Sequence, residues 1–182
     1  MINEGDCDRN IQVIVANPNY LLYNNRAVNF IVKFIQERPK YVVRNLNEEY
    51  RDFTIDIEKE ILLLSKAKAV VFLFPLTTYY MPTLLTQYVQ SVFTSKGFME
   101  AVFNKEFLIA VTTSQNESVF TGVKSMEILL SSVIQIAKDS GLHYIGIVRV
   151  FDPSDDSNDQ NEVLLEEACA KMVTLIDTNV NL

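Results

Sequence analysis

The chain has 182 residues, of which 48% are hydrophobic, and its 23 acidic and 16 basic side chains give a net charge of −7. This length fits one domain with one core, and the acidic surplus argues against a nucleic-acid footprint and against adsorption to an anionic membrane. No apolar run reaches the roughly 18 residues of a membrane-spanning helix, and the first residues have no signal-peptide pattern. We therefore expect a cytoplasmic protein without a membrane span.

Alternating strand and helix patterns follow a polar start. Residues 1–10 show no periodicity, which predicts a flexible N-terminal extension ahead of a single domain over residues 11–182. Residues 11–16 have the apolar character of a strand, and a turn-rich loop over 17–25 leads into a helix that ends before Pro39.

A shorter strand is predicted over 41–46, and Asp56 is a suitable N-cap for the helix that follows it. The expected apolar side of that helix is formed by Ile57, Ile61, Leu62 and Leu64.

Residues 69–93 form the segment around which the rest of the chain is organised. They begin with six apolar residues, rich in β-branched and aromatic side chains, as in a strand buried on both faces. Pro75 ends this strand because it has no amide hydrogen to donate. Pro82 is predicted at the first helical position, which suits its fixed φ, and an apolar helical face extends as far as Phe93.

The second half continues the alternation with a strand over 107–113 and a polar loop over 114–122. A fourth helix is expected to end at Gly141, in the position of a left-handed cap. Its predicted inner face is formed by Met126, Leu130, Val133, Ile134 and Ala137. The last strand is predicted over 144–151, and an acidic loop over 152–162 precedes a final helix.

Five strands that alternate with five helices predict an α/β fold. The expected architecture has three layers, with a doubly wound, five-stranded parallel sheet between two layers of helices and strand order 2-1-3-4-5. In that order a crevice opens between the first and third strands. We expect the loops 17–25, 75–81 and 112–122 to meet there.

The loop and helix after the central strand carry a family pattern. The pattern resembles the Phe-Pro-Leu-Tyr-Trp-Tyr-Ser-Met-Pro-Ala-Leu-Leu-Lys signature of flavodoxin-like fold NAD(P)H:quinone oxidoreductases, the family of DT-diaphorase and of the potassium-efflux ancillary reductases. The similarity runs from about Ile11 to Phe151. Its residues include Phe74-Pro75-Leu76, Tyr79, Met81-Pro82, Leu84-Leu85, Val92-Phe93, Asn17-Pro18 and Val111-Thr112-Thr113.

The resemblance implies a flavodoxin-like fold that holds a noncovalent flavin. It also implies hydride transfer from NAD(P)H through the flavin to a quinone-like small-molecule acceptor, and a homodimer with active sites near the interface. FMN is expected, with FAD as the other possibility, because the chain is short and has no visible adenine pocket.

The resemblance places the cofactor site in the three loops. Backbone amides and hydroxyl groups would meet the polar rim of the flavin, and a helix N-terminus would hold its phosphate. The implied cofactor-binding residues are Asn17, Tyr23, Asn25, Pro75, Leu76, Thr77, Thr78, Tyr79, Thr112, Thr113, Ser114 and Gln115. Tyr79 and Phe120 are expected to line the acceptor pocket, and no catalytic side chain is assigned. The alternative is that these threonines only satisfy backbone groups at strand ends and the aromatic rings only pack.

Several positions depart from the family pattern. Thr77-Thr78 replaces an aromatic pair, Ser114-Gln115 replaces two glycines, and Tyr23 replaces a serine for the cofactor phosphate. These departures motivate an alternative function, a binding or regulatory subunit with a degenerate flavin site and no turnover.

Other kinds of site find little support in the composition. With one histidine and two cysteines we expect neither a metal site nor a structural disulfide. Five glycines and no Gly-x-Gly-x-x-Gly or Walker motif exclude a glycine-built nucleotide cradle. His143 is expected at the opposite end of the sheet from the crevice, in a structural role.

Overall fold

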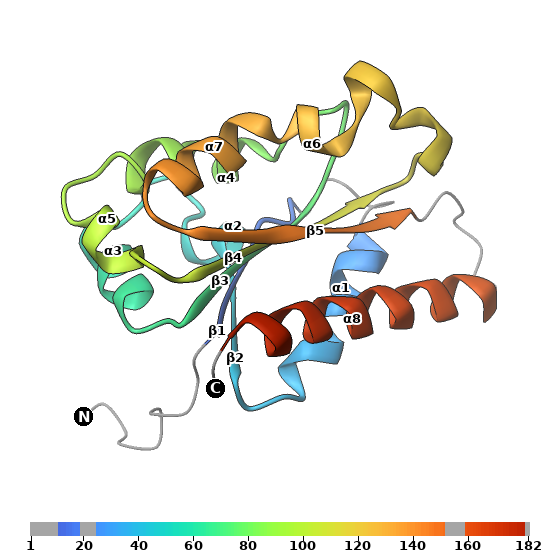
Figure 1. The fold of residues 1–182 in the computed structure, drawn as a ribbon, viewed down its shortest axis with the longest axis horizontal. Coiled ribbons are helices and arrows are strands. Elements are labelled where there is room, and N and C mark those ends of the chain that lie inside the picture. The colour runs from blue at the N-terminus through green and yellow to red at the C-terminus, as the bar shows by residue number, and fades with distance from the viewer. Residues whose placement is uncertain (1–10, 19–24, 152–158, 181–182) are drawn as a thin grey trace.

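The computed structural model describes residues 11–18, 25–151 and 159–180. A parallel sheet of five strands, in the order β2-β1-β3-β4-β5, forms its middle layer (Figure 1). The strands are β1 (Ile11–Val15), β2 (Tyr41–Asn45), β3 (Ala69–Pro75), β4 (Glu106–Thr113) and β5 (His143–Phe151). The predicted fold class and strand order are confirmed.

Helices cover both faces of this sheet (Figure 1). One face carries α1 (Asn25–Gln36) and α8 (Asp159–Asn179). The other helices, which pack on the opposite face or at its border, are α2 (Leu46–Glu49), α3 (Ile57–Ser65), α4 (Thr83–Val92), α5 (Phe98–Val102), α6 (Met126–Leu129) and α7 (Ser131–Asp139).

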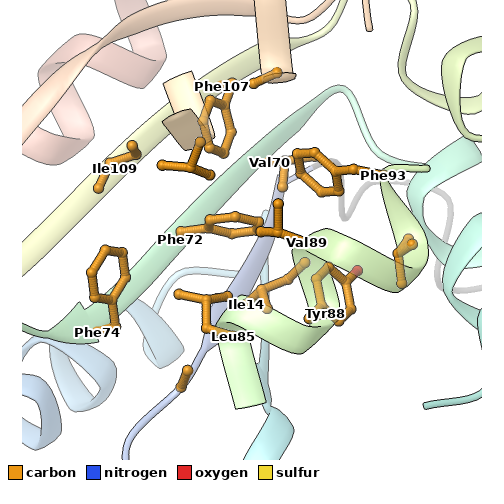
Figure 2. Close-up of a cluster of buried hydrophobic side chains, with 14 of the residues drawn as sticks. Ile14, Val70, Phe72, Phe74, Leu85, Tyr88, Val89, Phe93, Phe107 and Ile109 are labelled. Atoms are coloured by element: carbon orange, nitrogen blue, oxygen red, sulfur yellow. The ribbon is translucent and has the colours of Figure 1, made fainter. Parts of the chain in front are cut away.

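The central strand β3 separates two hydrophobic clusters because its side chains alternate between the faces of the sheet. Val70, Phe72 and Phe74 join the cluster under α4, whereas Val71 and Leu73 join the cluster under α1 and α8. Figure 2 shows the first cluster, in which the ring of Phe72 lies among residues of β4 and α4. Its centroid is 5.1 Å from that of Phe107, in an edge-to-face contact. The expected two-sided burial of this strand is therefore observed.

Some helix boundaries differ from the predicted ones. Pro82 has φ −53° and ψ 141°, so it occupies the N-cap and α4 begins one residue later. The predicted fourth helix is broken into α6 and α7 at Leu130, where the backbone leaves helical geometry, although its predicted inner face is buried. The short helices α2 and α5 were not predicted, because four or five residues show no clear period.

The predicted apolar side of α3 is partly wrong. Asp56 caps the helix as expected, because its carboxylate accepts the backbone amide of Lys59 at 3.0 Å. Leu64 is buried, but Leu62 is 56% exposed, and the fully buried side chain on the adjoining turn is Glu60. The helix is turned so that a carboxylate faces inward.

Glu60 is the centre of a buried polar network that joins β2, α3 and α4. Its two carboxylate oxygens accept hydrogen bonds from Arg44 at 2.5 and 2.8 Å, from the hydroxyl of Tyr50 at 2.5 Å and from that of Tyr88 at 2.8 Å. Burial raises the pKa of Tyr88 well above its ordinary value. The phenol therefore stays neutral and donates to the carboxylate.

Glu49 extends this network toward the surface. It accepts two hydrogen bonds from Arg44, at 2.9 and 2.6 Å, and one from Lys59 at 2.7 Å. Partial burial opposes the charged form, but these hydrogen bonds hold the pKa of Glu49 below its ordinary value. Arg44 thus bridges two carboxylates at the β2 edge of the sheet.

Several sequence-based expectations fall outside the described residues or concern other parts of the fold. Three of them lie outside the described ranges: the predicted extension over 1–10, Cys7 within it, and residues 152–158 of the acidic loop.

The other cysteine, Cys169, is buried, and burial raises the pKa of its thiol to about 11. His143 begins β5 opposite Glu106, whose carboxylate is 3.6 Å from its Nδ1.

Within the described ranges, no helix is long and apolar enough to cross a membrane. The same residues contain no group of three or more acidic, histidine or cysteine side chains that is arranged to hold a metal ion.

Candidate functional site

The carboxyl ends of β1, β3 and β4 lie next to one another because β3 pairs with both of the other strands. Pro75 pairs with Thr112 in the sheet register, and the amide of Leu76 donates to the carbonyl of Thr112 at 2.8 Å. On the other side, the amide of Ala16 donates to the carbonyl of Leu73 at 3.0 Å. The loops that leave these strands therefore start side by side, as the sequence predicted.

The loop after β3 is a tight turn with an unusual backbone. Thr77 and Tyr80 exchange two backbone hydrogen bonds, at 3.2 and 2.9 Å, around Thr78 and Tyr79. Both central residues have positive φ, 50° and 68°, which is the pattern of a type I′ turn. Asn and Gly adopt this conformation readily, whereas a bulky residue held there costs on the order of 1–3 kcal/mol. The turn leaves the side chain of Tyr79 39% exposed beside the loop of β4.

The loop after β4 uses one of its threonines to hold its own backbone. The hydroxyl oxygen of Thr113 accepts the amide of Gln115 at 3.2 Å. Ser114 and Gln115 are exposed, and two short 3-10 turns, Glu117–Val119 and Gly122–Lys124, carry the chain onward. The hydroxyl oxygen of Thr113 thus satisfies a backbone amide of its own loop, as the alternative interpretation of the threonines describes.

The two loops enclose a pocket of about 220 Å³. Its lining residues are Leu76, Thr78, Tyr79, Thr113, Gln115 and Phe120. The rings of Tyr79 and Phe120 are in edge contact with centroids 6.1 Å apart, and Phe120 in turn packs on Phe151 at 5.8 Å. Five of the predicted cofactor residues and the predicted acceptor residue Phe120 are thus brought together.

Three buried polar atoms without a partner among the described residues lie at the same edge of the sheet. The other such atoms belong to Gln12 and Tyr41, near the amino ends of β1 and β2, and to Asn47 in α2. The side-chain oxygens of Asn17, Thr77 and Thr112 are buried, and none has a hydrogen-bond partner. Each lies at the carboxyl end of a different strand, β1, β3 or β4. Such atoms are costly to leave unpaired, and an unexplained group of them is consistent with a ligand that supplies the missing hydrogen bonds. These three side-chain oxygens are therefore suited to form hydrogen bonds with the polar rim of a cofactor.

The first loop is described only at its two ends. Asn17 is 5% exposed, and its amide nitrogen is 3.4 Å from the side-chain oxygen of Asn29. Asn25 is the first residue of α1, whereas Tyr23 lies outside the described residues. Pro75 is the last residue of β3 and is buried, so it shapes the site only through its backbone.

One feature of the site was not anticipated from the sequence. The ammonium group of Lys124 lies 5.6 Å from the centre of the Tyr79 ring. The available signal was a basic residue two positions after the predicted loop 114–122, in an acidic chain.

A doubly wound parallel sheet with a pocket at the carboxyl ends of its central strands is the arrangement in which open α/β sheets bind their ligands. The sequence profile described as "Flavodoxin-like fold" matches residues 9–175. The uncharacterised NAD(P)H oxidoreductase YrkL of Bacillus subtilis is 30% identical over 139 residues, which are 74% of this chain and 78% of YrkL. The chain therefore belongs to the flavodoxin-like fold family and is a relative of its NAD(P)H oxidoreductases, as the resemblance indicated.

Other relatives and solved structures agree on the fold. The potassium-efflux ancillary protein KefG of Cronobacter sakazakii is 34% identical over 99 residues, 52% of this chain and 53% of KefG. General stress protein 14 of Treponema denticola, solved in complex with FMN, superposes with TM-score 0.77 at 20% identity, covering 91% of this chain and 99% of that one. An NADPH-quinone reductase from P. pentosaceus superposes with TM-score 0.74 at 21% identity, covering 95% of this chain and 99% of that chain.

Proposed function

We propose that this protein is an FMN-dependent NAD(P)H oxidoreductase that transfers a hydride from a nicotinamide through the flavin to a quinone-like acceptor. The observation that carries the proposal is the set of three unpartnered buried oxygens, on Asn17, Thr77 and Thr112, at the ends of three adjacent strands. The names of YrkL and of the FMN-bound neighbour support the same assignment.

When bound, FMN would supply the hydride chemistry, and the protein would supply orientation and electrostatics. The hydroxyls of Thr77 and Thr112 and the exposed residue Ser114 would hold the polar rim of the ring. The N-terminal end of α1 would hold the phosphate, because the first turn of a helix favours an anion. Tyr79 and Phe120 would present an aromatic surface to the donor and the acceptor in turn.

The test is the flavin content of the purified full-length chain and the response of its absorbance to NAD(P)H. We expect a yellow protein whose flavin band bleaches when NADH or NADPH is added without oxygen and returns when a quinone is added. Heat release of the cofactor followed by chromatography distinguishes FMN from FAD. A colourless chain that does not bind added flavin would refute the proposal.

The second candidate function is a binding or regulatory subunit without turnover. The edge contact between Tyr79 and Phe120 favours it, because the two rings pack on each other, as structural aromatic side chains do. A subunit of this kind would co-purify with a fixed protein partner and would show no reductase activity with any quinone. Bleaching of bound flavin by NAD(P)H would exclude it.

We further propose a cytoplasmic homodimer, with residues 11–182 as one domain and residues 1–10 as a flexible extension. Tyr80 is 76% exposed, and with Met81 and α4 it borders a groove of about 550 Å³. The α4 residues that line this groove are Thr83, Thr86, Gln87 and Gln90. Light scattering is expected to give twice the 20.8 kDa chain mass. Substitution Tyr80→Glu is expected to shift the population toward monomer, and a wild-type monomer at all concentrations would contradict the proposal.

A further inference from the structure

A positive charge lies beside the aromatic wall of the pocket. Lys124 ends the short turn Gly122–Lys124, and its ammonium group lies 5.6 Å from the centre of the Tyr79 ring. Tyr79 is the ring that contacts Phe120 and lines the pocket with it. A ligand whose aromatic ring contacts this wall is therefore within reach of the lysine, because the four-carbon stem of lysine is flexible.

The position of Tyr79 is maintained against the preference of its backbone. Thr78 and Tyr79 both have positive φ, which side chains of this size rarely adopt. Backbone strain of this kind persists where the surrounding structure imposes it, often at ligand sites. Here two hydrogen bonds between Thr77 and Tyr80 close the turn. The backbone that carries the ring beside Lys124 is thus held in a closed turn.

The charge of Lys124 is available to a ligand. The basic residue of β5, Arg149, forms an ion pair with Glu127. Among the ion pairs of the described residues, Lys124 takes no part. In a chain with a net charge of −7, one unpaired ammonium group at an aromatic pocket provides local attraction for an anion.

We propose that Lys124 makes this pocket selective for a flat aromatic acceptor that carries an anionic substituent, such as a carboxylate or sulfonate group. The role in turnover rests on the proposed reductase function, whereas the binding preference can be measured without it. Tyr79 and Phe120 contact the ring of the acceptor, and the ammonium group of Lys124 attracts its substituent. Lys124 is therefore a specificity-determining residue.

The first test compares two acceptors that share one ring system, 1,4-naphthoquinone and 1,4-naphthoquinone-2-sulfonate, on the FMN-loaded full chain. Lys124→Met is expected to lower kcat/KM for the sulfonate about three- to tenfold, mainly through KM, and to change the neutral quinone less than about twofold. Sodium chloride at about 0.5 M should reduce the wild-type preference for the sulfonate. The KM for NADPH should not change.

Lys138 provides a matched control. Its ammonium group lies 5.4 Å from the ring of Tyr144, near the start of β5 and away from the pocket, so Lys138→Met removes an equivalent contact and charge. We expect this variant to keep the wild-type preference. An equal loss in both variants would show a general charge effect and would overturn the inference. A change in the KM for NADPH, with no change in the KM for the acceptor, would also overturn it.

The second test measures binding alone, by calorimetry of the chain as purified and after addition of FMN. The probes are naphthalene-2-sulfonate and the neutral naphthalene-2-methanol. Wild type is expected to bind the sulfonate about three- to tenfold more tightly than Lys124→Met does, with equal affinity for the neutral probe. A wild-type chain that binds neither probe, or an unchanged preference in the variant, overturns the inference.

These outcomes separate the two proposals. A chain without flavin or NAD(P)H-dependent bleaching refutes the reductase, while a Lys124-dependent binding preference in the same chain supports an anion-selective aromatic pocket. An active reductase with equal use of both quinones by wild type and Lys124→Met refutes the inference about Lys124 alone.

Discussion

Replacing Glu60 with alanine is expected to lower the free energy of unfolding by about 3–5 kcal/mol, the cost of removing one partner from a buried ion pair. Glu60 is fully buried and accepts hydrogen bonds from Arg44, Tyr50 and Tyr88. Without the carboxylate, a guanidinium with only 9% of its side chain exposed loses its inner partner, and two phenols lose their acceptor. Urea unfolding followed by circular dichroism measures the change.

Glu58 on the same helix is a matched control. It is exposed, so Glu58→Ala is expected to change the free energy of unfolding by no more than about 0.5 kcal/mol. The double variant Arg44→Met with Glu60→Leu should be less destabilised than Glu60→Ala, since it leaves no unpaired buried charge. It also provides a measurable chain if the single variant does not fold. A loss below about 1 kcal/mol for Glu60→Ala would show that the network contributes little.

Replacing both Thr77 and Thr112 with valine is expected to weaken FMN binding by about 5- to 150-fold. The estimate assigns about 0.5–1.5 kcal/mol to each hydrogen bond that a bound flavin would make with these hydroxyls. In the chain without ligand both oxygens are buried and have no partner. The same double variant should therefore keep or slightly raise the free energy of unfolding. Titration of the apoprotein with FMN and urea unfolding provide the two measurements.

Thr94→Val provides the control for this pair. Its hydroxyl is exposed and donates to the carbonyl of Gln90 on the far end of α4, so its loss should leave FMN affinity within about twofold of wild type. If the double valine variant bound FMN as tightly as wild type, the two hydroxyls would not contact the flavin. If it lost stability by more than about 1 kcal/mol, the hydroxyls would have partners in the native fold.

The fold was predictable because its signals are local and repeated. The apolar run of β3 indicates a strand buried on both faces, and Phe72 and Val71 indeed face different clusters. Strand and helix alternate along the chain, and right-handed crossovers leave few ways to order five parallel strands. The positive φ of Gly141 at the end of α7 was likewise visible as a helix stop.

The orientation of α3 was not predictable from local pattern. A count of apolar positions favours burial of Ile57 and Leu62, yet both are exposed. Glu60 faces inward because Arg44 from β2 and Tyr88 from α4 surround it, and these residues are distant in sequence. A buried carboxylate is tolerable only with such partners, and no local window contains them.

By itself, the amino-acid sequence determined the sheet, its strand order and where the strands β1, β3 and β4 end, because apolar periodicity and chain stops act over short segments. Only the tertiary structure decided which side chains are free to meet a ligand. Thr113 is used by its own loop, whereas Thr77 and Thr112 keep unpaired oxygens, and Lys124 lies over Tyr79. Those differences depend on contacts between segments that meet only when the strands pair, so they are properties of the folded chain.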